Sequence, residues 1–214
     1  MFLRQLRTAV LMLIVLTVIT GLAYPLAITG LAQVLFPDKA DGSLIERDGQ
    51  VIGSELIGQN FVDLADDTSP TYGFTLPGYF RSRPSSAFPA EDGTLVSSGS
   101  NYGPTNQALL DRVTADVASL RQENTLAADA PIPVDLVTAS ASGVDPHISP
   151  ASAELQVPRV AQQRGLTEER VRKLVEDHTE GRTLGFMGEP RVHVLNLNLA
   201  LDEEAPLAPA AAAP

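Results

Sequence analysis

Three residues of the types used in acid–base chemistry lie close together in this sequence: Asp145, His147 and Ser149. A carboxylate, an imidazole and a hydroxyl can form a triad in which the imidazole removes the hydroxyl proton during nucleophilic attack. Such a triad depends on convergence in space, and no Gly-x-Ser-x-Gly nucleophile elbow occurs in the sequence. Ser149-Pro150 is also a favoured helix start. We therefore predict no catalytic site here, and a hydrolase that uses these residues stays an alternative.

The rest of the sequence offers little further chemistry. It contains no cysteine and no Gly-x4-Gly-Lys-Ser/Thr phosphate loop. The Asp-Lys-Ala-Asp-Gly run at 38–42 begins like a calcium loop but lacks the later ligand positions and the closing glutamate. His178 falls on the apolar face of a predicted helix, so we expect it to pack at a boundary, and His193 should point out of a predicted strand and be exposed. We predict no metal ligand and no directly bound cofactor.

The composition restricts the class of protein. The chain has 214 residues, a formal net charge of −11, and neither cysteine nor tryptophan. Binding to nucleic acid requires a basic surface, so the acidic excess argues against such a partner. An acidic surface can attract cations, although solubility is the simpler interpretation. A domain outside the cytoplasm would be held together without disulfides, which suits a bacterial-type envelope protein.

A long apolar stretch at the N-terminus organises the chain. Residues 8–37 contain no charged residue, and roughly 20 apolar residues are enough to cross a bilayer core of about 30 Å. Arg4 and Arg7 precede the stretch, which predicts a cytoplasmic N-terminus and an outer C-terminal part. A cleaved signal peptide with its site at 21–23 is the competing interpretation, but the apolar run continues well beyond the usual length of such a segment. We predict a single-pass protein of the bacterial inner membrane.

Small and polar residues at one level of this stretch predict a contact with another helix. Gly21, Tyr24 and Pro25 lie within one turn, together with Thr20. Residues of this kind usually face a neighbouring helix rather than lipid. Pro25 should also kink the helix, because it removes one backbone hydrogen bond. The alternative is that glycine and proline are merely tolerated, as they often are in membrane segments.

The patterns beyond the anchor predict an α+β protein with a single extracytoplasmic domain over residues 38–202. The remaining parts are a cytoplasmic N-terminus (1–7), the anchor (8–37) and a disordered Ala/Pro tail (203–214). Asp48-Gly49 between two apolar runs predicts a hairpin within 38–53. Strands are predicted at 131–138 and 191–201, where apolar residues alternate. Helices are predicted from Asn106 to about Arg121 and packed on a sheet, from Pro150 with a break or kink at Pro158, and from the cap Thr167 to Gly181.

A long loop and a polar corner separate these elements. Residues 63–104 are rich in Gly, Pro and Ser, but their aromatic residues favour a packed segment: Tyr72, Phe74, Tyr79, Phe80, Phe88 and Tyr102. The run 98–106 then leads into the first helix of the domain. We expect it to form a fixed corner bearing Ser100, Asn101 and Asn106, with Arg81 and Arg83 nearby. These side chains either satisfy turns and a cap or bind a partner.

Several of these stretches together resemble the C subunit of the bacterial potassium-transporting P-type ATPase, the Kdp complex. The resemblance covers nearly the whole chain apart from the tail. The sequence departs from the family pattern at Ser98, Tyr102, Ala141 and His193. The stretches that carry the resemblance are TGLAYP (20–25), LIGQ (56–59) followed by Phe61, YFRSRP (79–84), SGSNYGPTN (98–106), 134–161, QRGL (163–166) and 184–202.

The resemblance implies an accessory role in transport. In that complex a channel-like potassium-binding subunit, a P-type ATPase subunit, a small single-span subunit and this one together import potassium at the expense of ATP. The C subunit is implied to be required for assembly and to act as a catalytic chaperone that raises the ATP affinity of the ATPase subunit. ATP and potassium would be handled by the complex, since the Asp-Lys-Thr-Gly-Thr phosphorylation loop is absent from this sequence. An adaptor unrelated to potassium transport is the remaining alternative.

Overall fold

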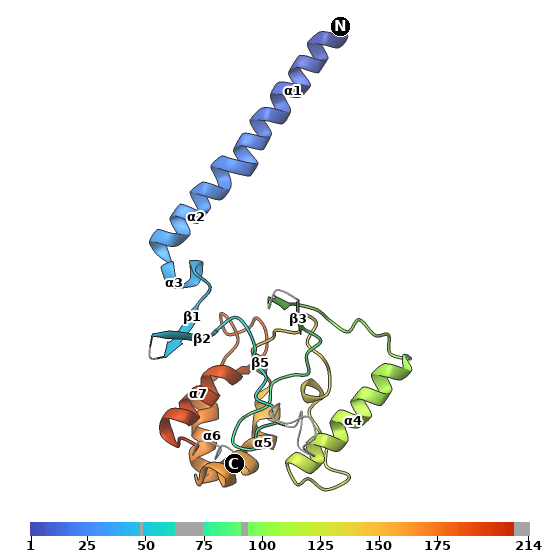
Figure 1. Ribbon diagram of the computed structural model, residues 1–214, viewed down its shortest axis with the longest axis vertical. Helices are drawn as coiled ribbons and strands as arrows, with labels where there is room; N and C mark the ends of the chain where they lie inside the picture. The colour runs from blue at the N-terminus through green and yellow to red at the C-terminus, as the bar shows by residue number, and fades with distance from the viewer. Residues whose placement is uncertain (48, 63–74, 91–93, 208–214) are drawn as a thin grey trace. The chain divides into compact units, whose positions relative to one another are not determined.

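The computed structural model describes residues 1–47, 49–62, 75–90 and 94–207, and the chain divides into two compact units, Met1–Ser54 and Glu55–Pro214. The first unit is an apolar helix followed by a hairpin, and the second combines helices with short sheets (Figure 1). The predicted α+β class with one N-terminal apolar helix is therefore confirmed.

The apolar helix of the first unit runs without interruption from Phe2 to Leu35. It comprises α1 (Phe2–Val18), the π turn η1 (Ile19–Ala23) and α2 (Tyr24–Leu35). Its 34 residues and its mean hydropathy of 2.3 in the most apolar window are sufficient to cross a membrane. The helix passes through Pro25 by means of the wider π turn, in which the Tyr24 N–H donates to the Ile19 carbonyl.

A short hairpin completes the first unit. The helix α3 (Pro37–Ala40) is followed by β1 (Leu44–Arg47) and β2 (Gln50–Ser54), which pair antiparallel with Arg47 opposite Gln50. Gly49 has a positive φ of 75°, as a tight hairpin turn of the predicted kind requires. The predicted hairpin is confirmed, although its first residues are helical and Asp48 lies outside the described residues.

The main core of the second unit surrounds a three-stranded antiparallel sheet. Its strands are β5 (His147–Ile148), β7 (Arg191–His193) and β6 (Thr179–Glu180), with β7 in the centre. Three helices pack around this sheet: α5 (Pro150–Arg164), α6 (Glu168–Asp177) and α7 (Val194–Glu204). Their fully buried side chains form one cluster with Phe80, which is 0 % exposed: Val157, Val160, Val171, Val194, Leu197 and Leu201.

A second, smaller core lies under α4 (Gln107–Glu123). Leu120 is fully buried against Leu136 and Val137, with Val113 and Leu155 packed at the edge. The prediction that this helix packs on a sheet is wrong, because its partners are α5 and the 3-10 turn η2 (Val134–Leu136). The remaining sheet pairs β3 (Phe88–Pro89) with β4 (Leu95–Val96).

One predicted strand is wrong, and a second is too long. Residues 131–138 form η2 and flanking turns, because Leu136 and Val137 are adjacent and both buried, whereas a strand would bury alternate residues. Residues 191–201 are strand only as far as His193. The ring of His193 then accepts the Asn196 N–H and caps α7, whose buried residues Val194, Leu197 and Leu201 follow a helical spacing.

The predicted helix starts are confirmed, whereas two predicted ends are wrong. Asn106, Ser149 and Thr167 each accept a backbone N–H at the first turn of α4, α5 and α6. Of the break or kink predicted at Pro158, the break does not occur, because α5 continues to Arg164 and is held on both sides of Pro158 by the buried Val157 and Val160. The helix α6 ends at Asp177, earlier than predicted, and α7 extends to Glu204, so residues 203–204 of the predicted tail are helical. Residues 208–214 lie outside the described part of the chain, as do Tyr72 and Phe74.

Candidate functional site

The three residues of the hydrolase alternative do not form a catalytic triad. Ser149 caps α5, and its hydroxyl donates to Asp135 Oδ1 at 3.0 Å while it accepts the Ser152 N–H. Asp145 and His147 do lie together, with 3.6 Å between Asp145 Oδ1 and His147 Nδ1. The hydroxyl that would be the nucleophile is therefore used by the helix start, as the Ser-Pro pair predicted.

His193 is buried rather than exposed, which corrects its prediction. Only 5 % of the residue is accessible, and its Nε2 lies 2.8 Å from the Glu55 carbonyl oxygen, to which it can donate. Its Nδ1 accepts the Asn196 N–H, so the two ring nitrogens have the partners of a neutral imidazole. The ring also contacts His147 edge-on, with 5.2 Å between centroids. His178 is half-buried beside the Leu174 carbonyl, in agreement with a boundary position.

Asp145 lies between the His147 ring and the Arg83 guanidinium. The neighbouring His147 ring lowers the pKa of Asp145 to about 2, with help from the His147 backbone N–H and the Arg83 guanidinium and against the effect of burial. Arg83 Nη1 lies 2.9 Å from Asp145 Oδ2. A pKa below the ordinary value of 3.8 means that the folded state holds the proton less tightly than the unfolded chain.

We expect the stabilisation from Asp145 to be present above about pH 4 and to be lost as the pH falls towards 2. Asp145→Asn should lower the free energy of unfolding on the order of 2 kcal/mol at pH 6, and the difference from the natural chain should shrink at pH 2.5. Urea unfolding at both pH values measures this effect. The exposed Asp129 offers a matched control, since Asp129→Asn should behave like the natural chain at both. An equal Asp145→Asn deficit at pH 2.5 would contradict the expectation.

The predicted polar corner is an exposed surface feature. Ser100 and Asn101 line a shallow groove of about 290 Å³ together with Tyr102 and Arg112. Asn101 has a positive φ of 52°, and its amide donates to the Gly99 carbonyl at 2.9 Å. Asn106 caps α4 through the Ala108 N–H at 2.9 Å. The cation that lines this groove is Arg112, whereas the expected Arg81 and Arg83 line a neighbouring one.

Close backbone contacts explain two glycines of this region. A Cβ placed on Gly99 would lie 2.5 Å from the Ala141 carbonyl oxygen, and one on Gly143 would lie 2.5 Å from that of Ser98. Real Cβ atoms do not approach so closely, so both positions require glycine. The loops 97–101 and 139–146 are thus packed backbone to backbone, which holds the corner in place. The sequence predicted a fixed corner here but did not indicate the backbone packing that fixes it.

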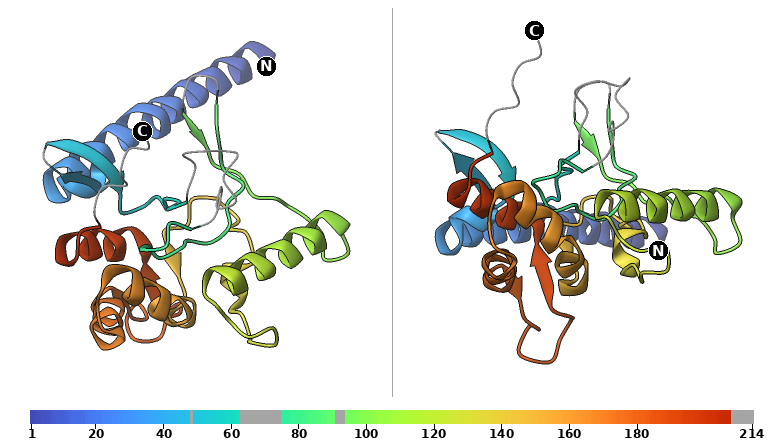
Figure 2. Two further views of the ribbon diagram at one scale, coloured as in Figure 1. Left: turned by 60° about the horizontal axis from the view of Figure 1, so that its bottom comes forward. Right: turned by 90° about the horizontal axis from the view of Figure 1, so that it is seen from below.

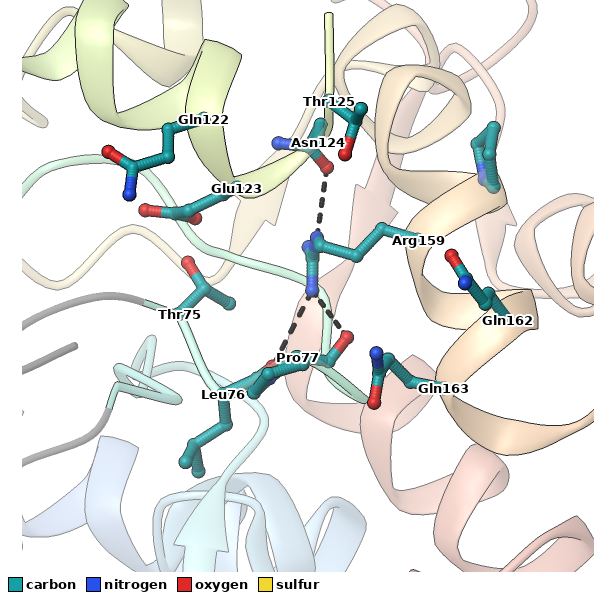
Figure 3. A pocket seen from close by; sticks show the side chains of 11 residues that line it. Thr75, Leu76, Pro77, Gln122, Glu123, Asn124, Thr125, Arg159, Gln162 and Gln163 are labelled. Atoms are coloured by element: carbon teal, nitrogen blue, oxygen red, sulfur yellow. Dashed lines mark hydrogen bonds between the residues drawn. The ribbon is translucent and has the colours of Figure 1, made fainter.

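A larger cavity of about 550 Å³ lies between the C-terminal end of α4, α5 and residues 75–77. Arg159 extends across it from α5 (Figure 3). Its guanidinium donates to Asn124 Oδ1 at 2.9 Å, to the Pro77 and Tyr79 carbonyls at 2.7 and 2.9 Å, and to Gln156 Oε1 at 2.8 Å. Burial lowers the pKa of Arg159 to about 10, so the group stays charged at neutral pH.

These contacts identify a role that the sequence reasoning missed. Asn198 donates to and accepts from the backbone of Phe80, Gln156 accepts the Arg81 N–H, and Arg164 donates to the Gly78 carbonyl. With Arg159, these buried side chains of α5 and α7 hold the segment 77–81, which begins in a turn and pairs with no strand among the described residues. The only sequence signal was polar residues at helix positions that face the core.

The predicted residues of the anchor lie at the π turn. Gly21 belongs to η1, Tyr24 closes it and Pro25 follows. Apart from its chain neighbours and the backbone of its own helix, a Cβ placed on Gly21 would meet nothing within 4 Å among the described residues, and every residue of the helix Phe2–Leu35 is at least partly accessible. The structure brings Gly21, Tyr24 and Pro25 together, and within the first unit the described residues leave this level of the helix open.

An apolar helix able to cross a membrane, joined to a folded α+β domain with polar surface grooves, defines a membrane-anchored protein. Residues 6–203 match the family described as K+-transporting ATPase, c chain. The chain belongs to this family.

Individual relatives support the same assignment over nearly the full length. A protein of Rhodopseudomonas palustris (strain BisB18), named Potassium-transporting ATPase KdpC subunit, is 54 % identical over 94 % of this chain and 98 % of its own. Proteins with the same name from Koribacter versatilis and Mycobacterium bovis are 53 % and 54 % identical over 95 % and 93 % of this chain and 97 % and 98 % of theirs. The anchor and the domain therefore both belong to the family's common length.

Proposed function

We propose that the chain is a non-catalytic subunit that assembles into an ATP-driven potassium import complex through its anchor and its domain. The family match over residues 6–203 carries this proposal, because it extends over both units of the chain. The similar proteins named Potassium-transporting ATPase KdpC subunit support it. Its partners would be the potassium-binding channel-like subunit, the P-type ATPase subunit and the small single-span subunit of the complex.

The proposed orientation places the N-terminus in the cytoplasm of a bacterial cell and the domain outside the inner membrane. Arg4 and Arg7 lie at the N-terminal end of the helix, and Asp38, Lys39 and Asp41 follow its other end. Positive residues close to a span are retained on the cytoplasmic side. An effect of this domain on the ATP affinity of the ATPase subunit would then be coupling between distant sites.

The polar corner is the proposed docking surface for the channel-like subunit. Ser100 and Asn101 are held by backbone packing and by the Asn101–Gly99 hydrogen bond, so their positions are fixed before a partner arrives. A pre-organised polar group loses less conformational entropy on binding than a mobile one. Asn106 lies at the start of α4 and would contribute from the edge of this surface.

Co-purification of the tagged full chain in mild detergent tests the assembly. We expect the large transporter subunits to be recovered with it, and a chain recovered without them would contradict the proposal. A reporter fused after Leu207 tests the orientation. This site lies beyond α7, whose Asp202 pairs with Arg164 at 2.8 Å and should be left intact. Activity of that reporter only in the cytoplasm would overturn the proposed orientation.

A further inference from the structure

The loop between β6 and β7 is an exposed projection with an apolar tip. Residues 181–190, which we call the apolar finger, are all exposed, and Figure 2 (right) shows them projecting beyond the sheet. At the tip, Leu184 is 78 % exposed, Phe186 70 % and Met187 48 %. Single exposed apolar residues are common on protein surfaces, but three large ones on one projecting turn are not required by the fold of the domain.

The finger holds its own shape by local hydrogen bonds. Thr183 and Met187 exchange backbone hydrogen bonds of 2.8 and 2.9 Å, and the turn between them is closed by bonds from Gly185 and Phe186. At the base, Arg182 pairs with Glu189 at 2.6 Å, and Arg191 pairs with Glu180 at 2.5 Å. The apolar side chains are thus presented on an ordered turn.

The backbone of the tip is strained in order to adopt this turn. Leu184 has a positive φ of 55°, in the left-handed region that a leucine rarely occupies, whereas Gly185 and Gly188 adopt their positive φ values without such a cost. Strain of this kind persists only where surrounding structure imposes it, and it concentrates at sites that bind. The contacts of the finger described above are all local, so none of them connects this strain to packing in the core of the domain.

The chemistry of the finger favours a protein partner over a lipid surface. Segments that bind anionic membranes carry unpaired basic residues beside their apolar face. Both arginines at the base of the finger, Arg182 and Arg191, are instead paired with glutamates, and the chain as a whole is acidic. Phenylalanine and methionine are enriched at the centre of protein–protein interfaces, where a polar rim surrounds them. The paired charges at the base supply such a rim.

We infer that the apolar finger inserts Leu184, Phe186 and Met187 into an apolar pocket on another subunit of the potassium-transporting ATPase. This inference rests on the proposed function, because it requires that the chain assembles with such subunits. The finger is separate in sequence from the polar corner at 98–106 and would provide an apolar anchor in addition to it.

A double variant tests the anchor in the full chain. Asparagine tolerates the left-handed conformation, so Leu184→Asn combined with Phe186→Ser should remove the apolar tip and keep the turn. Recovery of the transporter subunits with the tagged chain should fall about tenfold or more, as expected for truncating anchoring side chains. Val134 is 69 % exposed elsewhere in the domain, so Val134→Ser is a matched control that should leave recovery unchanged. The thermal unfolding midpoint of both variants in detergent should equal that of the natural chain.

Thiol labelling gives a second readout that leaves Leu184 and Phe186 in place. The chain has no cysteine, so Met187→Cys introduces a unique label site. A maleimide should react with it about tenfold or more slowly in the complex than in the free subunit in detergent, because the pocket covers it. Val134→Cys should react equally fast in both. A bifunctional maleimide at position 187 should cross-link to a transporter subunit.

The outcomes separate this inference from the proposed function. If the natural chain recovers no transporter subunits, the proposed function fails. If it recovers them, but the double variant recovers as much and the thiol reacts equally fast in both states, the finger inference alone is overturned. Slow labelling of position 187 in the free subunit in lipid vesicles would also overturn the finger inference, because it would show that the finger enters the bilayer. A cross-link only to a second copy of this chain would overturn it as well and would indicate self-association.

Discussion

Replacing Arg159 by alanine should lower the free energy of unfolding by about 3–5 kcal/mol. Arg159 is 9 % exposed, and its guanidinium donates to Asn124, Gln156 and two backbone carbonyls. Alanine would leave Asn124 Oδ1 and the Pro77 and Tyr79 carbonyls without this donor, while Gln156 Oε1 would keep the Arg81 N–H. Each unsatisfied buried group costs about 1–3 kcal/mol. For a domain of this size, the thermal unfolding midpoint should fall by about 10 °C.

Thermal unfolding of the full chain in detergent, followed by near-ultraviolet circular dichroism, measures this loss. Arg172 provides the control, because its guanidinium forms ion pairs with Glu154 and Glu168 at the surface and Arg172→Ala should change the midpoint little. The unfolding midpoint of Arg159→Lys should lie between those of Arg159→Ala and the natural chain. An ammonium group keeps the charge, but it lacks the planar fork with which the guanidinium reaches all four acceptors. An Arg159→Ala midpoint equal to that of the control would show that segment 77–81 is held by other contacts.

The features that the sequence predicted correctly depend on local interactions. The anchor follows from a run of apolar residues, and the starts of α4, α5 and α6 follow from Asn106, Ser149 and Thr167. A cap is a hydrogen bond between residues two or three positions apart, so the sequence contains all of it. The hairpin β1–β2 likewise depends on a turn pair between two short apolar runs.

The features that it missed depend on contacts between distant segments. The apolar residues between Val194 and Leu201 match the spacing of a strand as well as that of a helix. The helix forms because His193 caps it and because residues on both sides of the face formed by Val194, Leu197 and Leu201 are buried as well. Segment 77–81 makes no ladder with another strand among the described residues, since side chains of Gln156, Arg159 and Asn198 occupy its backbone groups. No local sequence pattern predicts a segment that is held by side chains of distant helices.

The candidate site shows the same division. The sequence located the corner at Ser100 and Asn101, but the packing of Gly99 on Ala141 that fixes it joins residues more than forty positions apart. Similarly, Asp145 and His147 are neighbours in sequence, whereas Arg83, which pairs with Asp145, comes from a distant loop. The sequence alone could therefore name polar residues on this surface without naming the contacts that hold them.

The second large effect is expected in the anchor, where Gly21→Leu should remove the subunit from the purified complex. Gly21 lies in the π turn before Pro25, and apart from its chain neighbours and its own helix backbone, nothing among the described residues lies within 4 Å of a Cβ placed there. In a membrane, a glycine at such a level allows the backbone of a neighbouring helix to approach closely. Leucine would fill that space and separate the helices, but it should not hinder insertion, because it is itself favourable in lipid.

The measurement compares recovery of the transporter subunits with the amount of variant chain found in the membrane fraction. Gly21→Ala should retain most of the complex, because a methyl group adds little width. Ala23→Leu adds similar bulk two residues later, on nearly the opposite side of the helix, and should be tolerated. If Gly21→Leu recovers as much of the transporter subunits as the natural chain does, Gly21 faces lipid. Equal loss with Ala23→Leu would indicate that bulk anywhere near the π turn disturbs the helix, so only loss confined to Gly21→Leu supports a helix contact on the Gly21 face.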